Sequence, residues 1–169
     1  MICKITKQRI NSFMSFGKMP IANGFLNKNQ FKKEFFFDLE VGFSKRLSLF
    51  QINDHPKPQQ MFNKDYPFFT GSSKGMVKHF NKYSRWIKKY YGNNLENLIE
   101  IGSNDGTFLK NFKASGYEHL GIEPSKNVAN YSKKINKVNV KNEFFNEKNC
   151  NKLKKFKKKT DLICAANVI

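Results

Sequence analysis

Apolar positions along this chain recur with two different periods. Between residues 76 and 90, apolar and aromatic side chains return every three or four positions, which gathers them on one face of an α-helix. From residue 98 onwards, short apolar runs alternate with helical patterns. The runs lie at residues 98–101, 120–123, 138–140 and 161–169, and the helical patterns lie at 107–115 and 127–134. Because strands that alternate with helices form parallel sheets, this half of the chain predicts an α/β fold with a partial Rossmann-like sheet.

The region before residue 72 keeps neither period for long. Two short apolar runs, at residues 35–41 and 47–52, predict strands. Turn-forming glycine, proline and asparagine residues mark turns at 16–20, 23–24 and 53–58. We therefore expect a small, mainly β and irregular domain here.

Three segments follow from these patterns. They are an N-terminal domain over residues 1–72, a bridging helix over 73–93 and the α/β domain over 94–169. Ser72 or Ser73 is available to cap the helix, and Gly92 to end it. The four strand candidates of the α/β domain amount to the first half of a doubly wound sheet, and the free edge that remains would promote aggregation. We expect a truncated chain or a fragment.

The charge of the chain is strongly positive, with a formal net charge of +18 over 169 residues. Nucleic-acid binding is the usual reason for such an excess. However, only Arg9, Arg46 and Arg85 are arginines, the residue best suited to bidentate phosphate contacts, and the lysines are scattered. We therefore do not expect a nucleic-acid partner. The lysine cluster at 152–160 is interpreted as an exposed helix end or loop, and an acidic small substrate such as a nucleotide diphosphate would suit the surface.

Cys3, Cys150 and Cys164 form an odd, widely separated set, with no signal-peptide pattern before them. No apolar stretch reaches the eighteen or so residues of a membrane helix. The sequence favours a soluble, cytoplasmic protein without a membrane partner, and leaves the oligomeric state open.

The candidate chemistry lies after the first strand of the α/β domain. Gly102 and Gly106 bracket a short polar loop, G-S-N-D-G, which leads into a helix. The fingerprint of dinucleotide-binding proteins has a further glycine between these two, so the loop disfavours a nicotinamide cofactor. Glu100 could accept the ammonium group of an amino acid, and Glu123, at the end of the next strand, could accept both ribose hydroxyls. A ligand with an amino acid at one end and a ribose at the other is S-adenosylmethionine.

A plainer interpretation of the same residues stays open. The two glycines could simply form a strand-to-helix turn, with Glu123 as a helix cap before Pro124.

Nearly the whole chain resembles the sugar C-methyltransferases. These enzymes join an N-terminal zinc-binding domain to a class I S-adenosylmethionine-dependent methyltransferase domain, and act on nucleotide-linked deoxy-keto sugars. The matching motifs are M-P-I-A-N-G-F-L at 19–26, M-F-N-K-D-Y at 61–66, S-S at 72–73, M-V-K-H-F at 76–80, E-I-G-S-N-D-G-T-F-L at 100–109, G-I-E-P-S at 121–125 and A-A-N-V at 165–168.

The resemblance implies roles for individual residues. The residues expected to cradle the methionyl part of the cofactor are Gly102, Ser103, Asn104 and Gly106. Glu123 is expected to hold the ribose, and Asn167 to lie along the cofactor by its backbone.

Two departures from the family pattern matter. The family's zinc site uses paired C-x-x-C motifs, whereas this chain has Cys3 followed by Thr6, and Ser44 and Leu47 where the second pair would fall. A tetrahedral zinc site needs four donors, so we predict no structural zinc and no other metal. Neither do His55, His79 and His119 have ligand spacing.

The second departure concerns the base that would remove a proton beside the sugar ketone. Tyr66 matches the family's tyrosine and is our catalytic candidate, but Phe69 stands at the position that we assign to the family's histidine. An unperturbed tyrosine has a pKa of about 10, so Tyr66 would need a partner to act as a base, and could instead orient substrate or simply pack.

The function predicted from the sequence is methyl transfer from S-adenosylmethionine to a carbon of a nucleotide-linked sugar. Two alternatives stay open, a nucleotide-dependent oxidoreductase on the same fold and a non-catalytic, lysine-rich binding fragment.

Overall fold

A computed structural model describes residues 1–153, 156 and 160–168 of the chain. The chain forms two compact units, Met1–Met61 and Phe62–Ile169. The boundary at residue 72 inferred from the sequence falls inside the second unit. Most of the lysine cluster at 152–160, interpreted above as a helix end or loop, lies outside the described residues.

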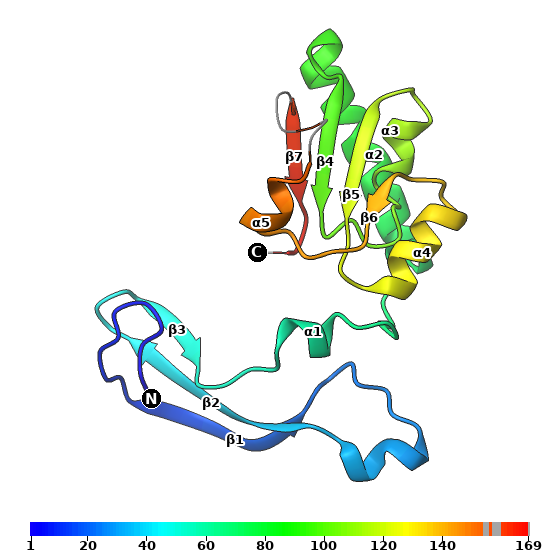
Figure 1. Ribbon diagram of the computed structural model, residues 1–169. Coiled ribbons are helices and arrows are strands. Elements are labelled where there is room, and N and C mark those ends of the chain that lie inside the picture. The colour runs from blue at the N-terminus through cyan, green and yellow to red at the C-terminus, as the bar shows by residue number, and fades with distance from the viewer. Residues whose placement is uncertain (154–155, 157–159, 169) are drawn as a thin grey trace. The chain divides into compact units, whose positions relative to one another are not determined.

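The first unit is built on a three-stranded antiparallel sheet in the order β1-β2-β3 (Figure 1). Its elements are β1 (Ser12–Pro20), the 3-10 helix η1 (Lys28–Lys33), β2 (Phe36–Ser44), β3 (Leu49–Ile52) and the short helix α1 (Pro58–Met61). Strands β2 and β3 confirm the two apolar runs that predicted strands, with β2 extending three residues further.

Strand β1 is the strand of this unit that the sequence did not predict. Its glycine and proline indicated a turn, but the structure absorbs Gly17 at an irregularity where the pairing with β2 shifts register between Ser15 and Lys18. Gly17 has φ +69, a conformation that glycine adopts at little cost. A turn residue inside a bulge therefore leaves the strand intact.

The second unit contains a four-stranded parallel sheet in the order β6-β5-β4-β7. The strands are β4 (Asn97–Ile101), β5 (Glu118–Ile122), β6 (Val140–Lys141) and β7 (Leu162–Ala165). The first strand of this sheet in the sequence is β4. The next two strands, β5 and β6, lie successively to one side of β4, and the last strand, β7, lies on its other side. This order is that of a doubly wound sheet, and it confirms the predicted α/β class.

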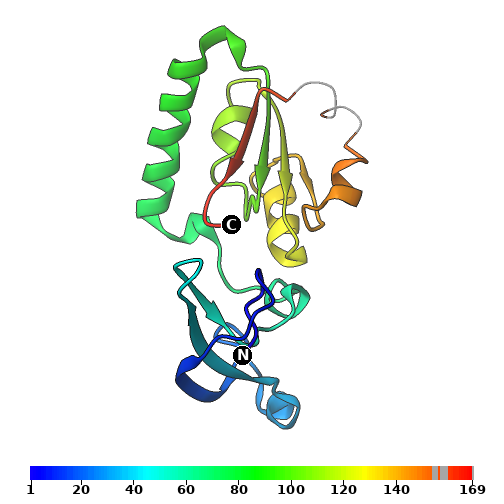
Figure 2. The same ribbon diagram turned by 90° about the vertical axis from the view of Figure 1, so that its left-hand side faces the viewer.

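Helices cover both faces of this sheet. They are α2 (Lys74–Tyr91), α3 (Lys110–Lys113), α4 (Lys126–Lys134) and α5 (Glu147–Cys150), with two short 3-10 helices, η2 (Thr70–Ser72) and η3 (Gly92–Asn94). Figure 2 shows α2 on one side of the sheet and α5 on the other. The predicted helix at 107–115 is shorter in the structure, where residues 107–109 and 114–115 form turns.

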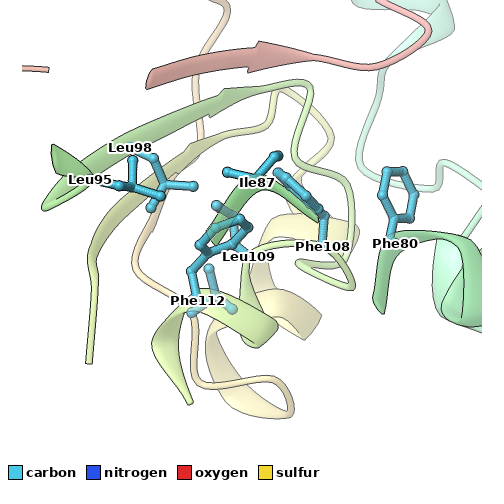
Figure 3. Packing of buried hydrophobic residues seen from close by; sticks show 8 residues of the cluster. Phe80, Ile87, Leu95, Leu98, Phe108, Leu109 and Phe112 are labelled. Atoms are coloured by element: carbon cyan, nitrogen blue, oxygen red, sulfur yellow. The ribbon is translucent and has the colours of Figure 1, made fainter. Parts of the chain in front are cut away.

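Helix α2 belongs to the core of the second unit. Its buried side chains Phe80 and Ile87 pack with Leu98 of β4 and with Phe108 and Phe112 (Figure 3). A second cluster, on the other face of the sheet, consists of Ile99, Leu120, Ile122, Leu153 and Phe156. Burial on both faces explains why the strands are apolar runs without alternation.

Among the described residues, no helix has the length and the apolar character needed to cross a lipid bilayer.

Candidate active site

The glycine loop after β4 has the tight conformation that its sequence indicated. Gly102, Asn104 and Gly106 have φ values of +65, +49 and +78, in the left-handed region that favours glycine and tolerates asparagine. The amide nitrogen of Gly102 donates to the carbonyl oxygen of Ile122 over 2.8 Å, which ties the loop to the end of β5. The amide nitrogen of Gly106 donates to the carbonyl oxygen of Ser103 over 3.0 Å and closes the turn.

This loop lies where the strand order reverses. β4 has β5 on one side and β7 on the other, and doubly wound proteins bind ligands at the carboxyl ends of such strands. The residues after β7 come close to the loop: a Cβ added at Gly102 would collide with the side chain of Val168. Asn167, with φ +59, stands beside Val168. The fold therefore brings Gly102 and Asn167, more than sixty residues apart in the chain, to one edge of the sheet.

Glu123 follows β5 and is only 4% exposed. Its Oε2 accepts a hydrogen bond from the backbone nitrogen of Asn104 over 3.0 Å, and its Oε1 accepts from the backbone nitrogen of Ser125 over 2.7 Å. Burial raises the pKa of its carboxyl group, and these hydrogen bonds oppose that rise. Each carboxylate oxygen keeps a second lone pair that can accept a further bond, such as one from a ribose hydroxyl.

Glu100, on β4, is buried beneath the loop, and its Oε2 has no hydrogen-bond partner. Burial, followed by the negative charges of Asp105 and Glu123, raises the pKa of its carboxyl group well above the usual range. Its neighbour across the sheet is Cys164 of β7, whose thiol pKa rises to about 11 because of burial and the charge of Glu100.

Three acidic side chains thus gather around one loop without a cation. Glu100, Asp105 and Glu123 are each at most 4% exposed. Within the described ranges, no lysine, arginine or histidine nitrogen lies within 4.0 Å of their carboxylates. Buried negative charge is costly unless something positive compensates it. The raised pKa of Glu100 is the consequence of this cost, and a bound ligand that carries positive charge would favour the ionised form of Glu100. The site is therefore suited to such a ligand.

The segment before α2 lies against the same loop. Asn104 accepts a hydrogen bond from the Thr70 nitrogen at Oδ1 over 2.8 Å, and donates from Nδ2 to the Phe68 carbonyl over 3.1 Å. Asp105 accepts at Oδ2 from the Gly71 nitrogen over 2.7 Å. Asp105 was absent from the site residues predicted above, although its place between the two glycines was a signal for it.

Tyr66 lies at the start of this segment. Asn127 of α4 donates from Nδ2 to the carbonyl oxygen of Tyr66 over 2.7 Å. The tyrosine ring packs against Phe62 and Phe68, with centroids 5.6 Å away in both cases. Burial, and next the negative charge of Glu123, raises the pKa of the phenol. Tyr66 therefore lies close enough to Glu123 for the charge of the carboxylate to affect the phenol, a proximity that the sequence did not indicate.

An open cavity of about 300 Å³ lies between this segment and α4. It is lined by Phe69, Gly71, Ser72, Asp105 and Tyr131. Because residue 71 is a glycine, its backbone can approach Asp105 closely. A Cβ at this position would lie 2.8 Å from Oδ2 of Asp105.

The first unit was expected to lack zinc, and its donor set does not fit the metal. The sulfur of Cys3, which is fully buried, accepts hydrogen bonds from the Gln51 amide over 3.0 Å and from the Thr6 backbone nitrogen over 3.4 Å. Oε1 of Gln51 accepts in turn from the Lys4 backbone nitrogen over 2.8 Å. Across the described part of the chain, no three His, Cys, Asp or Glu side chains gather as metal ligands would. The sulfur of Cys3 is therefore surrounded by hydrogen-bond donors. A zinc ion bound to this sulfur would need three further ligands.

The strand order and the glycine loop define a doubly wound α/β domain. A family model described as "Methyltransferase domain" matches residues 76–169, more than half of the chain, and the chain belongs to this family. A second model, described as "Putative zinc binding domain", matches residues 2–62. The two matches confirm the two-part organisation that the resemblance implied.

A curated relative points the same way. The C-methyltransferase NovU of Streptomyces niveus is 25% identical to this chain over 118 residues, which cover 69% of this chain and 28% of that protein. The chain therefore spans little more than a quarter of the length of this relative.

Proposed function

We propose that the chain binds S-adenosylmethionine at the glycine loop and serves the transfer of its methyl group to a carbon atom of a nucleotide-linked sugar. The observation that carries this proposal is the group of three buried carboxylates, Glu100, Asp105 and Glu123, around a loop at the reversal of strand order. S-adenosylmethionine has a sulfonium and an ammonium group, so it supplies the positive charge that these carboxylates lack.

The same observation argues against the oxidoreductase alternative. Dinucleotide cofactors place a negatively charged diphosphate on the glycine loop and the helix that follows. Buried carboxylates beside the loop would repel a diphosphate. The charge of the site therefore favours a cationic cofactor.

Each residue at the loop has a role in this proposal. The backbone that cradles the methionyl part is that of Gly102, Ser103, Asn104 and Gly106. A side chain at Gly102 would collide with Val168, and one at Gly106 would collide with Ser132 and Val138. Glu123 holds the ribose hydroxyls, Glu100 compensates the positive charge, and Asn167 lies along the cofactor by its backbone. This assignment follows the resemblance to the sugar C-methyltransferases and rests on the positions described above.

The cofactor supplies an electrophilic methyl group. In the proposed reaction the electron pair of a substrate carbanion would form the new C–C bond, and the electron pair of the broken C–S bond would remain on sulfur, which would leave S-adenosylhomocysteine. Holding the two reactants in line supplies much of the rate enhancement in such reactions, up to about 7–11 kcal/mol.

Tyr66 orients the acceptor in this scheme. Its phenol pKa is raised, so the group is protonated at neutral pH and can donate a hydrogen bond to a substrate oxygen but cannot accept a proton. The three cysteines are free thiols, as suits the reducing cytoplasm in which we propose that the protein acts.

Calorimetric titration tests the proposal. We expect saturable binding of S-adenosylhomocysteine, with no binding of NADH and no salt-sensitive binding of single-stranded DNA. Folded protein that binds NADH or DNA but not S-adenosylhomocysteine would overturn the proposal in favour of the respective alternative.

A further inference from the structure

The side-chain amide of Asn104 is hydrogen-bonded to a segment outside the cofactor loop to which its backbone belongs. Its oxygen accepts from the nitrogen of Thr70, and its nitrogen donates to the carbonyl of Phe68. A single primary amide thus pairs with two backbone groups of one segment, as a neighbouring strand would. Asp105 extends this pairing by one residue, to the nitrogen of Gly71.

The backbone of the same two residues is held by two other side chains. The nitrogen of Asn104 donates to Oε2 of Glu123, and the carbonyl of Asp105 accepts from Nδ2 of Asn136 over 2.6 Å. The left-handed conformation of Asn104 allows its nitrogen and its side chain to serve two different neighbours. Asn104 therefore connects Glu123 to the segment over residues 66–71 through hydrogen bonds from its backbone and from its side chain.

We propose that Asn104 and Asp105 are positioning residues that couple the cofactor loop to the segment over residues 66–71, so that cofactor binding orders Tyr66 for the methyl acceptor. This inference rests on the proposed function. Cofactor bound at the loop and at Glu123 restrains the backbone of Asn104, its amide then holds Phe68 and Thr70, and Asn127 holds Tyr66 at the start of the segment.

Hydrogen exchange of the intact chain, with and without S-adenosylhomocysteine, tests this coupling. In the wild type we expect the ligand to slow exchange of the amides of Thr70 and Gly71 about tenfold. In Asn104→Gly, which keeps the left-handed backbone and removes the amide, we expect exchange about tenfold faster without ligand, because the bond to Thr70 is lost. The ligand should then slow it less than about twofold.

Calorimetry separates positioning from direct contact with the cofactor. If the side chain of Asn104 only positions the segment, Asn104→Gly should still bind S-adenosylhomocysteine saturably, although the backbone of residue 104 belongs to the proposed cradle. Loss of binding in a folded variant would mean that the side chain contacts the cofactor, and would overturn the proposal. Ser48→Gly, at an exposed left-handed position of the first unit, controls for the effect of glycine itself.

Two further variants keep the test decisive if Asn104→Gly fails to fold. Asn104→Asp retains the acceptor for Thr70 but cannot donate to Phe68, so it should lose part of the coupling. Gly71→Ala places a Cβ against Oδ2 of Asp105 and should free the segment from its other end. Unchanged exchange over 66–71 in both variants would overturn the proposal.

The failure of this inference is distinct from failure of the proposed function. A wild type that does not bind S-adenosylhomocysteine would contradict the proposed function, whereas a wild type that binds it without any change in exchange over 66–71 would contradict the coupling alone.

Discussion

The backbone nitrogen of Asn104 donates a hydrogen bond to Oε2 of Glu123 over 3.0 Å, across a separation of 19 residues. This bond joins the loop after β4 to the end of β5, the two places where the sequence indicated a cofactor. Because Glu123 also accepts from the nitrogen of Ser125, its carboxylate is fixed before any ligand arrives. A fixed carboxylate lowers the entropic cost of holding a ribose.

Gly102→Ala is expected to weaken cofactor binding. The new methyl group would be held at φ +65 and pressed against Val168, at the point where the cofactor must approach the backbone. Calorimetric titration with S-adenosylhomocysteine should show affinity at least about tenfold weaker, the equivalent of about 1.4 kcal/mol.

Gly116→Ala is the matched control for this change. Gly116 also has a positive φ, of +80, but nothing lies within 4 Å of its Cβ position. Both variants should lose about 1–2 kcal/mol of stability from the left-handed backbone, and only Gly102→Ala should lose ligand. Equal affinity in the two variants would exclude the loop as the binding site.

Glu100→Gln is expected to stabilise the protein at high pH. The pKa of Glu100 is raised in the folded state, so between the unfolded value, about 4.5, and the folded value the folded protein binds more protons than the unfolded chain. The free energy of unfolding therefore falls as the pH rises through this range, and the glutamine removes that contribution. Urea unfolding at pH 5 and pH 8 should show a gain from Glu100→Gln that is larger at pH 8.

Glu147→Gln provides the comparison, since Glu147 is an exposed acidic residue in the first turn of α5. It should change the pH dependence of unfolding very little. A pH dependence unaltered by Glu100→Gln would mean that another group dominates it.

The first unit should be insensitive to chelators. Since hydrogen bonds from Gln51 and Thr6 surround the sulfur of Cys3, treatment with EDTA should leave the unfolding transition of the protein unchanged, and metal analysis should find no bound zinc. A lower transition after chelation would contradict this.

Gln51→Ala should destabilise the first unit by about 1–2 kcal/mol, because it removes the partner of both Cys3 and Lys4. Hydrogen bonds from Thr6 and Gln51 hold the pKa of the Cys3 thiol at about 6, so the variant should also raise that pKa. The ultraviolet absorbance of the thiolate, followed against pH in the folded protein, measures this change. Gln59→Ala, at an exposed position, should do neither.

Ser73→Ala should destabilise helix α2 by about 1 kcal/mol. Oγ of Ser73 accepts a hydrogen bond from the nitrogen of Met76 over 3.3 Å, which satisfies one free donor of the first turn. Thermal or urea unfolding of Ser73→Ala beside Ser72→Ala measures the effect. Ser72, the other cap that the sequence allowed, instead donates to the carbonyl of Phe69, so its loss should cost less.

Much of the second unit could be predicted from local patterns. The period of apolar residues predicted α2 with its end at Gly92, and the apolar runs predicted the four parallel strands, because both signals arise from burial of neighbouring positions. Strand β1 was missed because Gly17 indicates a turn locally, and only pairing with β2 reveals the bulge that absorbs it.

The sequence by itself determined the class of fold, the glycine loop and the carboxylate at Glu123, since each depends on residues close together in the chain. The tertiary structure alone decided that Glu100 lies buried without a hydrogen-bond partner at Oε2, and that the side chain of Asn104 holds Phe68 and Thr70. It also decided that the side-chain amide of Gln51 donates a hydrogen bond to the sulfur of Cys3. These contacts join residues far apart in the chain, and their energies depend on burial, which no local pattern of residue types specifies.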